Sequence, residues 1–552
     1  MYKSLTILLG IFRMLAFPVQ FQDRGFTYGQ PQIDSLMRET ELYLNEQFCG
    51  TREFTIDLMD PVLLGGNAAY YGKNSSDRKD AQIRDAIGEA LSSIKDKTDL
   101  SQYDNDGDGE IDNVLIVAAG PSEADGAGED WIWPQYGQLK DIGGVIYVSG
   151  KRVNTFTTIT EMMEEGIFSG IGTAVHELGH VLGLKDMYDT DGELSGGLTK
   201  GLWGSLSVMD HGLENNGGAT PPPFNAIELD QLGIGRCDTL GVGSFRLSPV
   251  SESHSYIKAF SSERGRYQLM ECRSGSGRDA YSGAKGLLVY NVDRSGSPAG
   301  YSDYYKIELS AAERWIWNEV NCNPDHQCAE LSPAITEATD ISQVSFPQVG
   351  KNRFPVRNLA VVDIAMDGDD VTFSVIEPVK DVRTVTYQDA ATVSWICDPS
   401  IHAIDSQISF KDSSDSTRTE KAAEDNGRFY ATLSGLEPKT ACSALISITD
   451  SDGLKYSHEV RFRTKSRRNG TLPFIYLNAA ERNADGSFKR GTGIPLMVYN
   501  ATGVAEIRWT FNGGAIKTGP DGLYHIEREG QLKAEVFYED GSVELIIKEI
   551  RL

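Results

Sequence analysis

The 552-residue chain contains little cysteine, no long apolar segment and no excess of basic residues. Seven cysteines are too few for a disulfide scaffold, and an odd number leaves at least one thiol without an intramolecular partner. The placement of the cysteines still favours two bridges, Cys322–Cys328 and Cys397–Cys442. No segment has the run of about 20 apolar residues that a membrane-spanning helix needs, so we expect no transmembrane span.

Acidic residues outnumber basic ones by 79 to 52, which gives a formal net charge of −27. This balance disfavours binding to nucleic acid or to anionic membrane surfaces, because both carry negative charge. It suits calcium binding and solubility outside the cell, although a well-solvated surface is the simplest explanation. The composition, 40% hydrophobic and 24% charged, is ordinary for a soluble globular protein, and the length predicts several domains.

The N-terminal residues give evidence both for and against a signal peptide. Lys3 and the short apolar run Leu5–Phe12 could form the core of a signal peptide, but Arg13 interrupts the run and no clean small-residue cleavage site follows. Residues 14–21 (MLAFPVQF) look more like the first strand of a domain. Export is therefore an inference and is not read directly from this segment.

Residues 171–189 (IGTAVHELGHVLGLKDMYD) contain the motif H-E-x-x-H. On a helix, His176 and His180 are four residues apart and share one face, so both imidazoles can bind one metal ion. Glu177 lies at the edge of that face, where its carboxylate can take a proton from a water molecule on the metal. The motif alone arises by chance, but here it lies in an apolar helical pattern that favours a catalytic site.

A glycine and two aspartates follow the motif. Gly183 can leave the helix with positive φ and turn the chain back, which brings Asp186 toward the metal. Asp189 is a competing third ligand. Two histidines, one carboxylate and a water molecule make the open arrangement of a catalytic zinc ion, so we expect Zn²⁺ on His176, His180 and Asp186.

A second candidate metal site lies at residues 104–112 (DNDGDGEID), whose alternating aspartates resemble the first half of an EF-hand loop. Gly109 permits the sharp turn, whereas position twelve is Leu115 in place of the usual glutamate. The alternative is a solvated acidic turn, but aspartates this close would repel one another without a cation. We therefore expect a structural Ca²⁺ held by Asp104, Asp106, Asp108 and Asp112.

The segment Trp203–Gly212 (WGSLSVMDHG) follows the zinc motif. A methionine in a tight turn at this distance lies beneath the zinc ion in metzincins, so we expect Met209 to form an apolar floor there. His211 could stabilise an oxyanion, although a solvated surface histidine is the simpler interpretation. Helical patterns at residues 33–47 and 78–94 and strand patterns at 54–59 and 114–119 predict an α/β domain around these motifs.

With these motifs, the chain resembles the M6 metallopeptidases of the immune-inhibitor-A type. The matching segments occur in order along the chain: FPVQFQD (17–23), SQYDNDGDGEIDNVLIVAAG (101–120), DWIWP (130–134), HELGHVLGLKDMYD (176–189), WGSLSVMDHG (203–212), PPPFNAIELDQLGIG (221–235), RYQLMECR (266–273) and GLLVYNVD (286–293). Two departures are Gln135, where a histidine is common, and the near absence of a prosegment before Met14.

The resemblance implies a secreted, zinc-dependent endopeptidase with structural calcium. By position, His176, His180 and Asp186 take the metal and Glu177 acts as the general base. It also implies protein or peptide substrates and a secreted, cell-surface or periplasmic location. The alternative is a non-catalytic adhesion or binding protein with a degenerate peptidase domain.

The rest of the chain has strand patterns and no convincing long helix. Residues 378–466 resemble a fibronectin type III domain in which Cys442 replaces the usual corner tyrosine, and residues 467–552 resemble an immunoglobulin-like domain. Such modules act as spacers or contact extracellular proteins or glycans. We therefore expect a metzincin-like α/β catalytic domain (1–240), a β-sandwich domain (241–377) and these two β modules.

Overall fold

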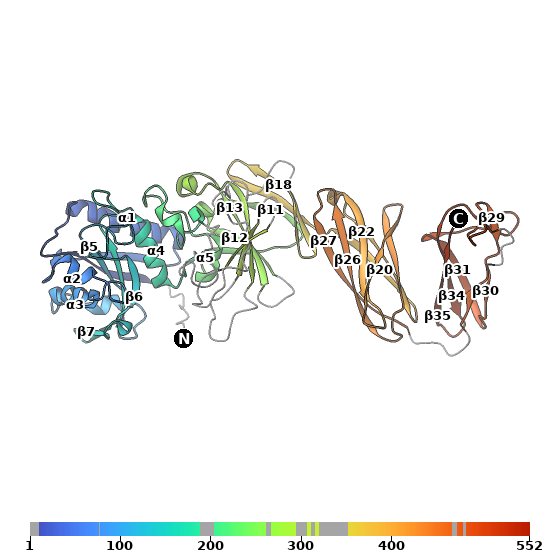
Figure 1. The fold of residues 1–552 in the computed structure, drawn as a ribbon, viewed down its shortest axis with the longest axis horizontal. Helices are drawn as coiled ribbons and strands as arrows, with labels where there is room; N and C mark the ends of the chain where they lie inside the picture. The colour runs from blue at the N-terminus through green and yellow to red at the C-terminus, as the bar shows by residue number, and fades with distance from the viewer. Residues whose placement is uncertain are drawn as a thin grey trace. The chain divides into compact units, whose positions relative to one another are not determined.

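The structure is a computed structural model, whose fold is drawn in Figure 1. The chain divides into two compact units. The first contains Met1–Gly241, Phe245–Asn352 and Ile364–Phe373, and the second contains Val242–Ser244, Arg353–Asp363 and Ser374–Leu552. The described residues are 10–76, 78–187, 204–260, 266–293, 306–310, 315–319, 352–465, 472–477 and 482–552. Asp189, the Cys322–Cys328 pair and most of the apolar run at the N-terminus lie outside them.

A mixed six-stranded sheet organises the first unit, with strand order β2-β1-β5-β9-β6 and β3 paired to β1. Its strands are β1 (Ile11–Gln20), β2 (Glu53–Leu58), β3 (Val62–Leu63), β5 (Val114–Ala118), β6 (Gln135–Gln138) and β9 (Thr155–Thr160). Strands β2, β1, β5 and β9 are parallel, whereas β6 runs antiparallel to β9 at the edge. Every residue of β5 is buried, as expected for a parallel strand covered on both faces.

Helices cover both faces of this sheet. Along β1, Met14 and Ala16 belong to one hydrophobic core, and Leu15 and Phe17 to the other, because successive side chains point to opposite faces. The first core includes residues of α1 and α4, and the second includes residues of α2 and α3. The helices of this unit are α1 (Gln30–Phe48), α2 (Ala68–Gly72), α3 (Ile83–Ile94), α4 (Ile171–Leu182), α5 (Ala226–Leu232) and α6 (Val250–Ser253).

The α/β pattern expected from the sequence is therefore confirmed for this part of the chain. The helix expected at residues 78–94 begins only at Ile83. The residues before it turn instead, because Asp80 has a positive φ of 46° and its buried carboxylate accepts hydrogen bonds from the Trp133 backbone and the Gln135 side chain. These contacts are distant in sequence, so the local pattern could not reveal them.

Two further sheets follow the mixed sheet in the chain. The first has the order β10-β12-β13-β14-β15-β16, and the second has the order β11-β19-β18-β17. Their strands are β10 (Arg236–Thr239), β11 (Gly243–Leu247), β12 (Ser255–Phe260), β13 (Arg266–Arg273), β14 (Gly286–Asp293), β15 (Lys306–Ser310), β16 (Trp315–Glu319), β17 (Phe354–Val356), β18 (Leu359–Asp367) and β19 (Asp370–Ile376). The expected β-rich region is confirmed, while its identity as a β-sandwich domain stays a prediction.

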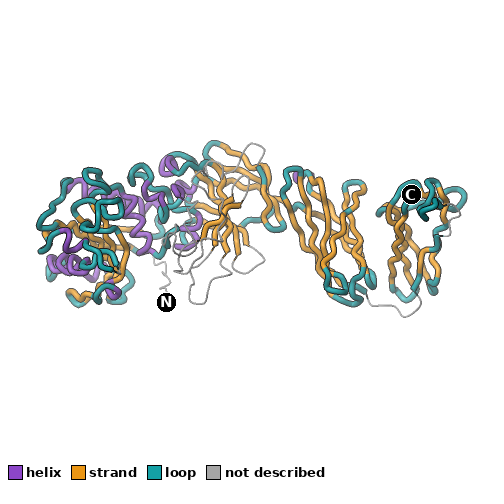
Figure 2. The backbone as a smooth tube through the Cα atoms, viewed as in Figure 1, coloured by secondary structure: helices purple, strands orange, loops and turns teal. Residues whose placement is uncertain are grey.

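Two four-stranded antiparallel sheets, β20-β21-β25-β24 and β23-β22-β26-β27, share one core around the fully buried Trp395. They comprise β20 (Val379–Thr386), β21 (Ala390–Cys397), β22 (Ala403–Lys411), β23 (Thr417–Lys421), β24 (Ala423–Asp425), β25 (Arg428–Ser434), β26 (Ala441–Asp450) and β27 (Lys455–Arg463). In Figure 2, helices gather around the first sheet, whereas the C-terminal part consists mainly of strands and loops.

The last part of the chain is also built from strands. Its largest sheet has the order β32-β31-β34-β35, and two small sheets pair β28 with β30 and β29 with β33. The strands are β28 (Phe474–Ile475), β29 (Thr492–Ile494), β30 (Val498–Tyr499), β31 (Val504–Phe511), β32 (Gly514–Ala515), β33 (Tyr524–Ile526), β34 (Gly530–Tyr538) and β35 (Val543–Ile550). The fibronectin-like and immunoglobulin-like assignments, and the four-domain division, stay predictions.

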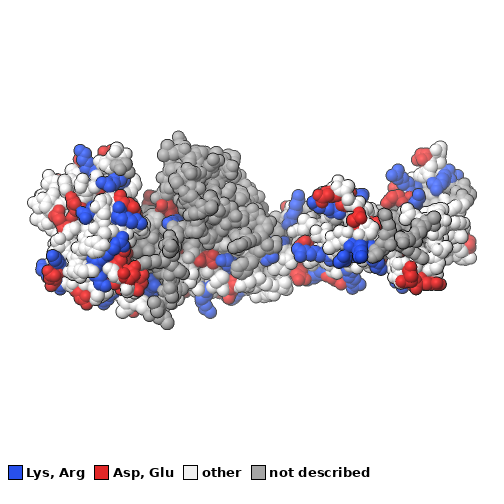
Figure 3. All heavy atoms as spheres, turned by 90° about the horizontal axis from the view of Figure 1, so that it is seen from below, with Lys and Arg blue, Asp and Glu red and all other residues white. Residues whose placement is uncertain are grey.

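Among the described residues on the face drawn in Figure 3, acidic and basic side chains are interspersed. This distribution fits a well-solvated surface. Among the described helices, none has both the length and the apolar character that crossing a membrane requires.

The expected bridge between Cys397 and Cys442 is wrong, because both residues are free thiols. Cys397 is the last residue of β21, whereas Cys442 is near the start of β26. A backbone bond from Leu436 to Asp389 holds the approach to β26 beside the start of β21. The two cysteines therefore lie near opposite ends of β21, which are seven residues or about 23 Å apart. A disulfide needs Cα atoms within about 7 Å of each other.

We expect Cys442→Ser to change the free energy of unfolding by no more than about 0.5 kcal/mol, as for most substitutions near a surface. Losing a native disulfide would cost about 2–5 kcal/mol. Denaturant unfolding of the full chain, followed by tryptophan fluorescence, measures the difference. A bridge would instead give Cys397→Ser, Cys442→Ser and the double variant the same large loss.

Candidate metal centre

Helix α4 carries the zinc motif and is buried along most of its length. It packs against α1, β6 and β9, which explains why its sequence is apolar apart from the motif. The helix ends at Gly183, which adopts the left-handed conformation with φ 105°, as expected. The Gly183 N–H bonds back to the helix, and the chain then returns toward the motif.

The two histidines face one another across one turn of α4, with ring centroids 4.9 Å apart. His176 Nδ1 lies 2.8 Å from the Val208 carbonyl oxygen, and His180 Nδ1 lies 3.0 Å from that of Leu184. A carbonyl can only accept, so each Nδ1 carries the proton and each Nε2 keeps a lone pair for a metal ion.

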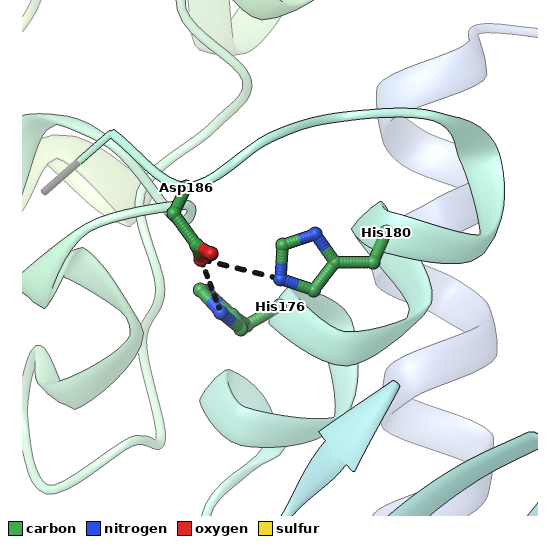
Figure 4. A group of neighbouring side chains, drawn as sticks. All are labelled: His176, His180 and Asp186. Atoms are coloured by element: carbon green, nitrogen blue, oxygen red, sulfur yellow. Dashed lines mark ion pairs between the residues drawn. The ribbon is translucent and has the colours of Figure 1, made fainter. Parts of the chain in front are cut away.

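Asp186 completes a group of three ligand atoms that lie within 4.8 Å of one another. Its Oδ1 atom is 3.3 Å from His176 Nε2 and 3.2 Å from His180 Nε2. Dashed lines in Figure 4 mark these two ion pairs. A tetrahedral ion with bonds of about 2.0–2.1 Å spaces its ligand atoms about 3.3 Å apart. This Oδ1 is also buried without a satisfactory hydrogen bond from any described residue. The donor set and its spacing therefore fit Zn²⁺.

The electrostatics of the group also favour a cation. Burial would raise the pKa of Asp186, but the nearby His176 and His180 hold it well below its ordinary value. Burial would lower the pKa of His176, but Asp186 and Glu177 outweigh this effect and raise it to about 9. The carboxylates thus favour positive charge at this place, and a proton competes with a metal ion for the same nitrogen.

Glu177 is buried beside the ligand group and is not part of it. Burial raises the pKa of its carboxyl above the ordinary value, and the nearby His176 and His180 oppose that rise. A buried carboxylate next to the ligands, with a raised affinity for protons, has the properties of a general base.

Met209 is fully buried and lies against α4, in the segment where a methionine floor was expected. A Cβ atom added at Gly179 would lie 2.6 Å from the Met209 sulfur, so only glycine allows this close approach. Met209 also accepts a backbone hydrogen bond from Met187 at 2.8 Å. His211 is exposed and lies 3.8 Å from carboxylate oxygens of Asp210 and Glu214, which fits a solvated surface histidine.

Asp104, Asp106 and Asp108 form a second group with ligand atoms within 4.8 Å of one another. Asp104 Oδ1 is buried, and no described group donates a hydrogen bond to it. Its other oxygen accepts bonds from the Gly109 backbone at 2.9 Å and from Lys151 Nζ at 2.6 Å. An orphaned carboxylate oxygen among aspartates fits a hard cation such as Ca²⁺.

Asp112, the fourth expected calcium ligand, lies outside this group. Its Oδ2 accepts hydrogen bonds from the backbone and side chain of Asn105, at 2.7 and 2.9 Å. Asn105 in turn accepts a bond from the Arg13 backbone of β1 at 2.7 Å. Asp112 therefore fastens the loop to the first sheet.

Two residues of β6 near the centre were not understood from the sequence. Gln135 donates a hydrogen bond to Asp80 at 2.6 Å, and burial raises the pKa of that aspartate to about 8. This contact ties the edge strand to the segment before α3. The Tyr136 ring lies 5.9 Å from the His180 ring, which places β6 beside the candidate ligands. No local sequence signal marks either contact.

Comparison with known families matches residues 18–226 to "Immune inhibitor A peptidase M6, catalytic domain". Residues 18–226 are an M6 peptidase domain. This segment contains His176, Glu177, His180 and Asp186 together with the acidic loop. The resemblance inferred from the sequence is therefore confirmed for this domain, and it supports a peptidase that uses a metal ion.

The chain is also similar, over short stretches, to curated proteins whose names include immune inhibitor A and a metalloprotease. The chain is 30% identical over 179 residues to immune inhibitor A of Bacillus thuringiensis subsp. alesti, covering 27% of this chain and 25% of that protein. It is 32% identical over 146 residues to the pre-pro-metalloprotease PrtV of Vibrio cholerae serotype O1 (strain M66-2), covering 22% and 16%. The M6-like chain thus spans a quarter or less of these relatives.

Among solved structures, the fibronectin type III domain of the human collagen alpha-1(XX) chain is 16% identical to this chain. The match covers 17% of this chain and 90% of that one, with a TM-score of 0.15. A score this low does not identify the C-terminal modules.

The third zinc ligand can be tested with two matched aspartate variants. We expect Asp186→Ala to lower the affinity for zinc by about 100-fold or more, since loss of an outer partner alone costs 10–100-fold. Asp189→Ala, three residues on, should bind zinc like the wild type. Competition with a chromophoric chelator measures both constants. The reverse ranking would make Asp189 the ligand.

The acidic loop predicts stabilisation by calcium. Titrating zinc-saturated, calcium-depleted protein with Ca²⁺ should raise the melting temperature, because a ligand of the folded state adds about 2.7 kcal/mol at 100 times its Kd. Asp106→Asn and Asp108→Asn should weaken this shift. Asp112→Asn should weaken it less, because Asp112 lies outside the group of ligand atoms and bonds Asn105. A wild-type melt insensitive to calcium would contradict the site.

Proposed function

We propose that the chain is a secreted zinc metalloendopeptidase that hydrolyses peptide bonds in proteins. The observation that carries the proposal is the distance of Asp186 Oδ1 from His176 Nε2 and from His180 Nε2, 3.3 and 3.2 Å, which matches two edges of a zinc tetrahedron. Glu177 lies buried next to this group. The acidic net charge of −27 and the family resemblance support a location outside the cell.

When bound, zinc would lower the pKa of a water molecule and polarise the carbonyl of the scissile bond. Glu177 would accept the proton of the attacking water on its carboxylate and deliver it to the leaving amine nitrogen. Its burial suits both steps, because a raised pKa makes the carboxylate a stronger base and its burial limits competing water. His176 and His180 are held by backbone carbonyls, so they would hold the metal without rearrangement.

Strand β6 offers a place for an extended substrate. It pairs with β9 along one edge, and no other described strand pairs with its second edge. Unpaired backbone groups at a sheet edge can bind an extended peptide through main-chain hydrogen bonds. Because Tyr136 of β6 lies next to His180, a peptide bound along this edge would pass close to the metal ligands.

We also propose that Ca²⁺ binds Asp104, Asp106 and Asp108 in a structural role. The bonds that join Asn105 to Arg13 and to Asp112 link this loop to β1 and so to the central sheet. A cation there would fix the loop that precedes β5 without taking part in hydrolysis.

Substitution of the general base tests the proposal. We expect Glu177→Ala to keep the fold and the zinc content but to lower the rate of casein hydrolysis by about 10²–10⁴-fold. Glu164→Gln, an exposed acid of the same domain, is the matched control and should keep the wild-type rate. Rates are compared per zinc-loaded chain, with zinc measured by elemental analysis.

Two outcomes would contradict the proposal. Hydrolysis at the wild-type rate by Glu177→Ala would exclude Glu177 as the base. Zinc-loaded wild-type protein that cleaves neither casein nor a peptide library would favour the alternative, a binding protein with a degenerate peptidase domain.

A further inference from the structure

The turn formed by residues 205–209 holds parts of the metal centre that are far apart in sequence. The Val208 carbonyl accepts the hydrogen bond from His176 at 2.8 Å. Met209 accepts the backbone bond from Met187, the residue after Asp186, at 2.8 Å. The position of this turn therefore sets both the direction of one histidine ligand and the path of the chain next to the aspartate ligand.

The turn is itself held by buried polar groups behind it. Ser207 Oγ donates to Glu228 Oε1 at 2.6 Å and accepts from the Met209 N–H at 3.0 Å. Arg273 Nη2, on β13, donates to the Leu206 carbonyl at 3.3 Å. These bonds reach the turn from α5 and from β13, two elements that carry no candidate metal ligand.

Arg273 belongs to a fully buried ionic network. Its Nε is 2.7 Å from Glu271 Oε1, and its Nη1 is 2.8 Å from Asp279 Oδ1. The Tyr290 hydroxyl donates to Glu271 at 2.6 Å, and Glu271 also accepts from the backbone N–H of Ala226 at the start of α5. The network therefore connects β13, β14, α5 and the turn.

Stability alone is a poor reason for such a network. Removing charges from water costs several kcal/mol per ion, and a well-packed apolar cluster of similar volume is often as stable or more stable. Buried charges do fix direction, because each donor must meet its acceptor in one geometry. Here Nη2 of Arg273 donates a hydrogen bond to the carbonyl of Leu206. Leu206 is two residues before Val208, whose carbonyl bonds His176.

We propose that Glu228, Glu271 and Arg273 are positioning residues of the metal centre, which act through the 205–209 turn to hold His176 in its ligating direction. This inference rests on the proposed zinc site and adds to it residues from the β-rich part of the first unit. It predicts that metal affinity depends on bonds formed by side chains that do not touch the metal.

Ser207→Ala is the most direct test, because it removes both side-chain hydrogen bonds of Ser207 and keeps the size of the side chain almost unchanged. We expect zinc affinity to fall by about 10–100-fold, the usual cost of losing a partner that orients a ligand. We also expect the visible absorption bands of the Co²⁺-loaded protein to change, since they report ligand geometry. Glu228→Gln keeps its shape and loses one acceptor, so it should cause a smaller change in the same direction.

Ser274→Ala is the matched control. Ser274 is another buried serine. Among the described residues, its side chain bonds to Asp279 at 3.3 Å and to Ser276 at 3.2 Å, and not to the turn or to Glu228, Glu271 or Arg273. Its variant therefore shows the effect of losing a buried hydrogen bond that does not reach the turn. It should keep the wild-type zinc affinity and Co²⁺ spectrum, although its melting temperature falls. Circular dichroism checks that each variant is folded at the temperature of measurement.

The outcomes separate the two proposals. Wild-type protein that does not bind zinc would overturn the proposed function itself. Wild-type protein that binds zinc, with folded Ser207→Ala and Glu228→Gln binding it equally well, would overturn only the positioning role. An equal loss of affinity in Ser274→Ala would also overturn it, because the effect would then follow from general loosening.

Discussion

Two backbone carbonyls determine which histidine nitrogens the candidate metal centre can offer to a ligand. Each accepts a hydrogen bond from the Nδ1–H group of one histidine, so each ring offers only its Nε2 atom to a ligand. The Leu184 carbonyl is available because Gly183 turns the chain back over α4, and the Val208 carbonyl because the 205–209 turn packs against Gly179. The position of Asp186 and the rest of the geometry of the site depend on these two turns, the one at Gly183 and the one at residues 205–209.

The sequence predicted best what depends on local spacing. His176, His180, Gly183 and Asp186 lie within eleven consecutive residues, and a helix with a glycine end is enough to bring them together. The α/β character of the domain followed from periodicity in the same way. The M6 resemblance was also visible in the sequence, because several short segments typical of that family follow one another in the same order along this chain.

Features that depend on distant contacts were missed or misjudged. The start of α3 is set by Asp80, whose partners lie more than fifty residues away. The expected bridge failed because a short sequence pattern does not tell which end of a strand a cysteine occupies. The support of the 205–209 turn by Arg273 could not be inferred either, since nothing in the local sequence of β13 indicates a partner sixty-seven residues earlier.

Lys151 gives the acidic loop a property that its three aspartates do not suggest. Its ammonium group already pairs with Asp104, so it offsets one of the three negative charges that face a cation. Affinity for calcium in such loops follows the charge and number of ligands, and extracellular sites bind with Kd values of about 10⁻⁴–10⁻³ M. A loop weakened in this way would stay empty at cytosolic calcium levels and fill at the higher levels outside cells. On the proposed calcium site, Lys151 would thus make the order of this loop depend on the calcium concentration around the protein.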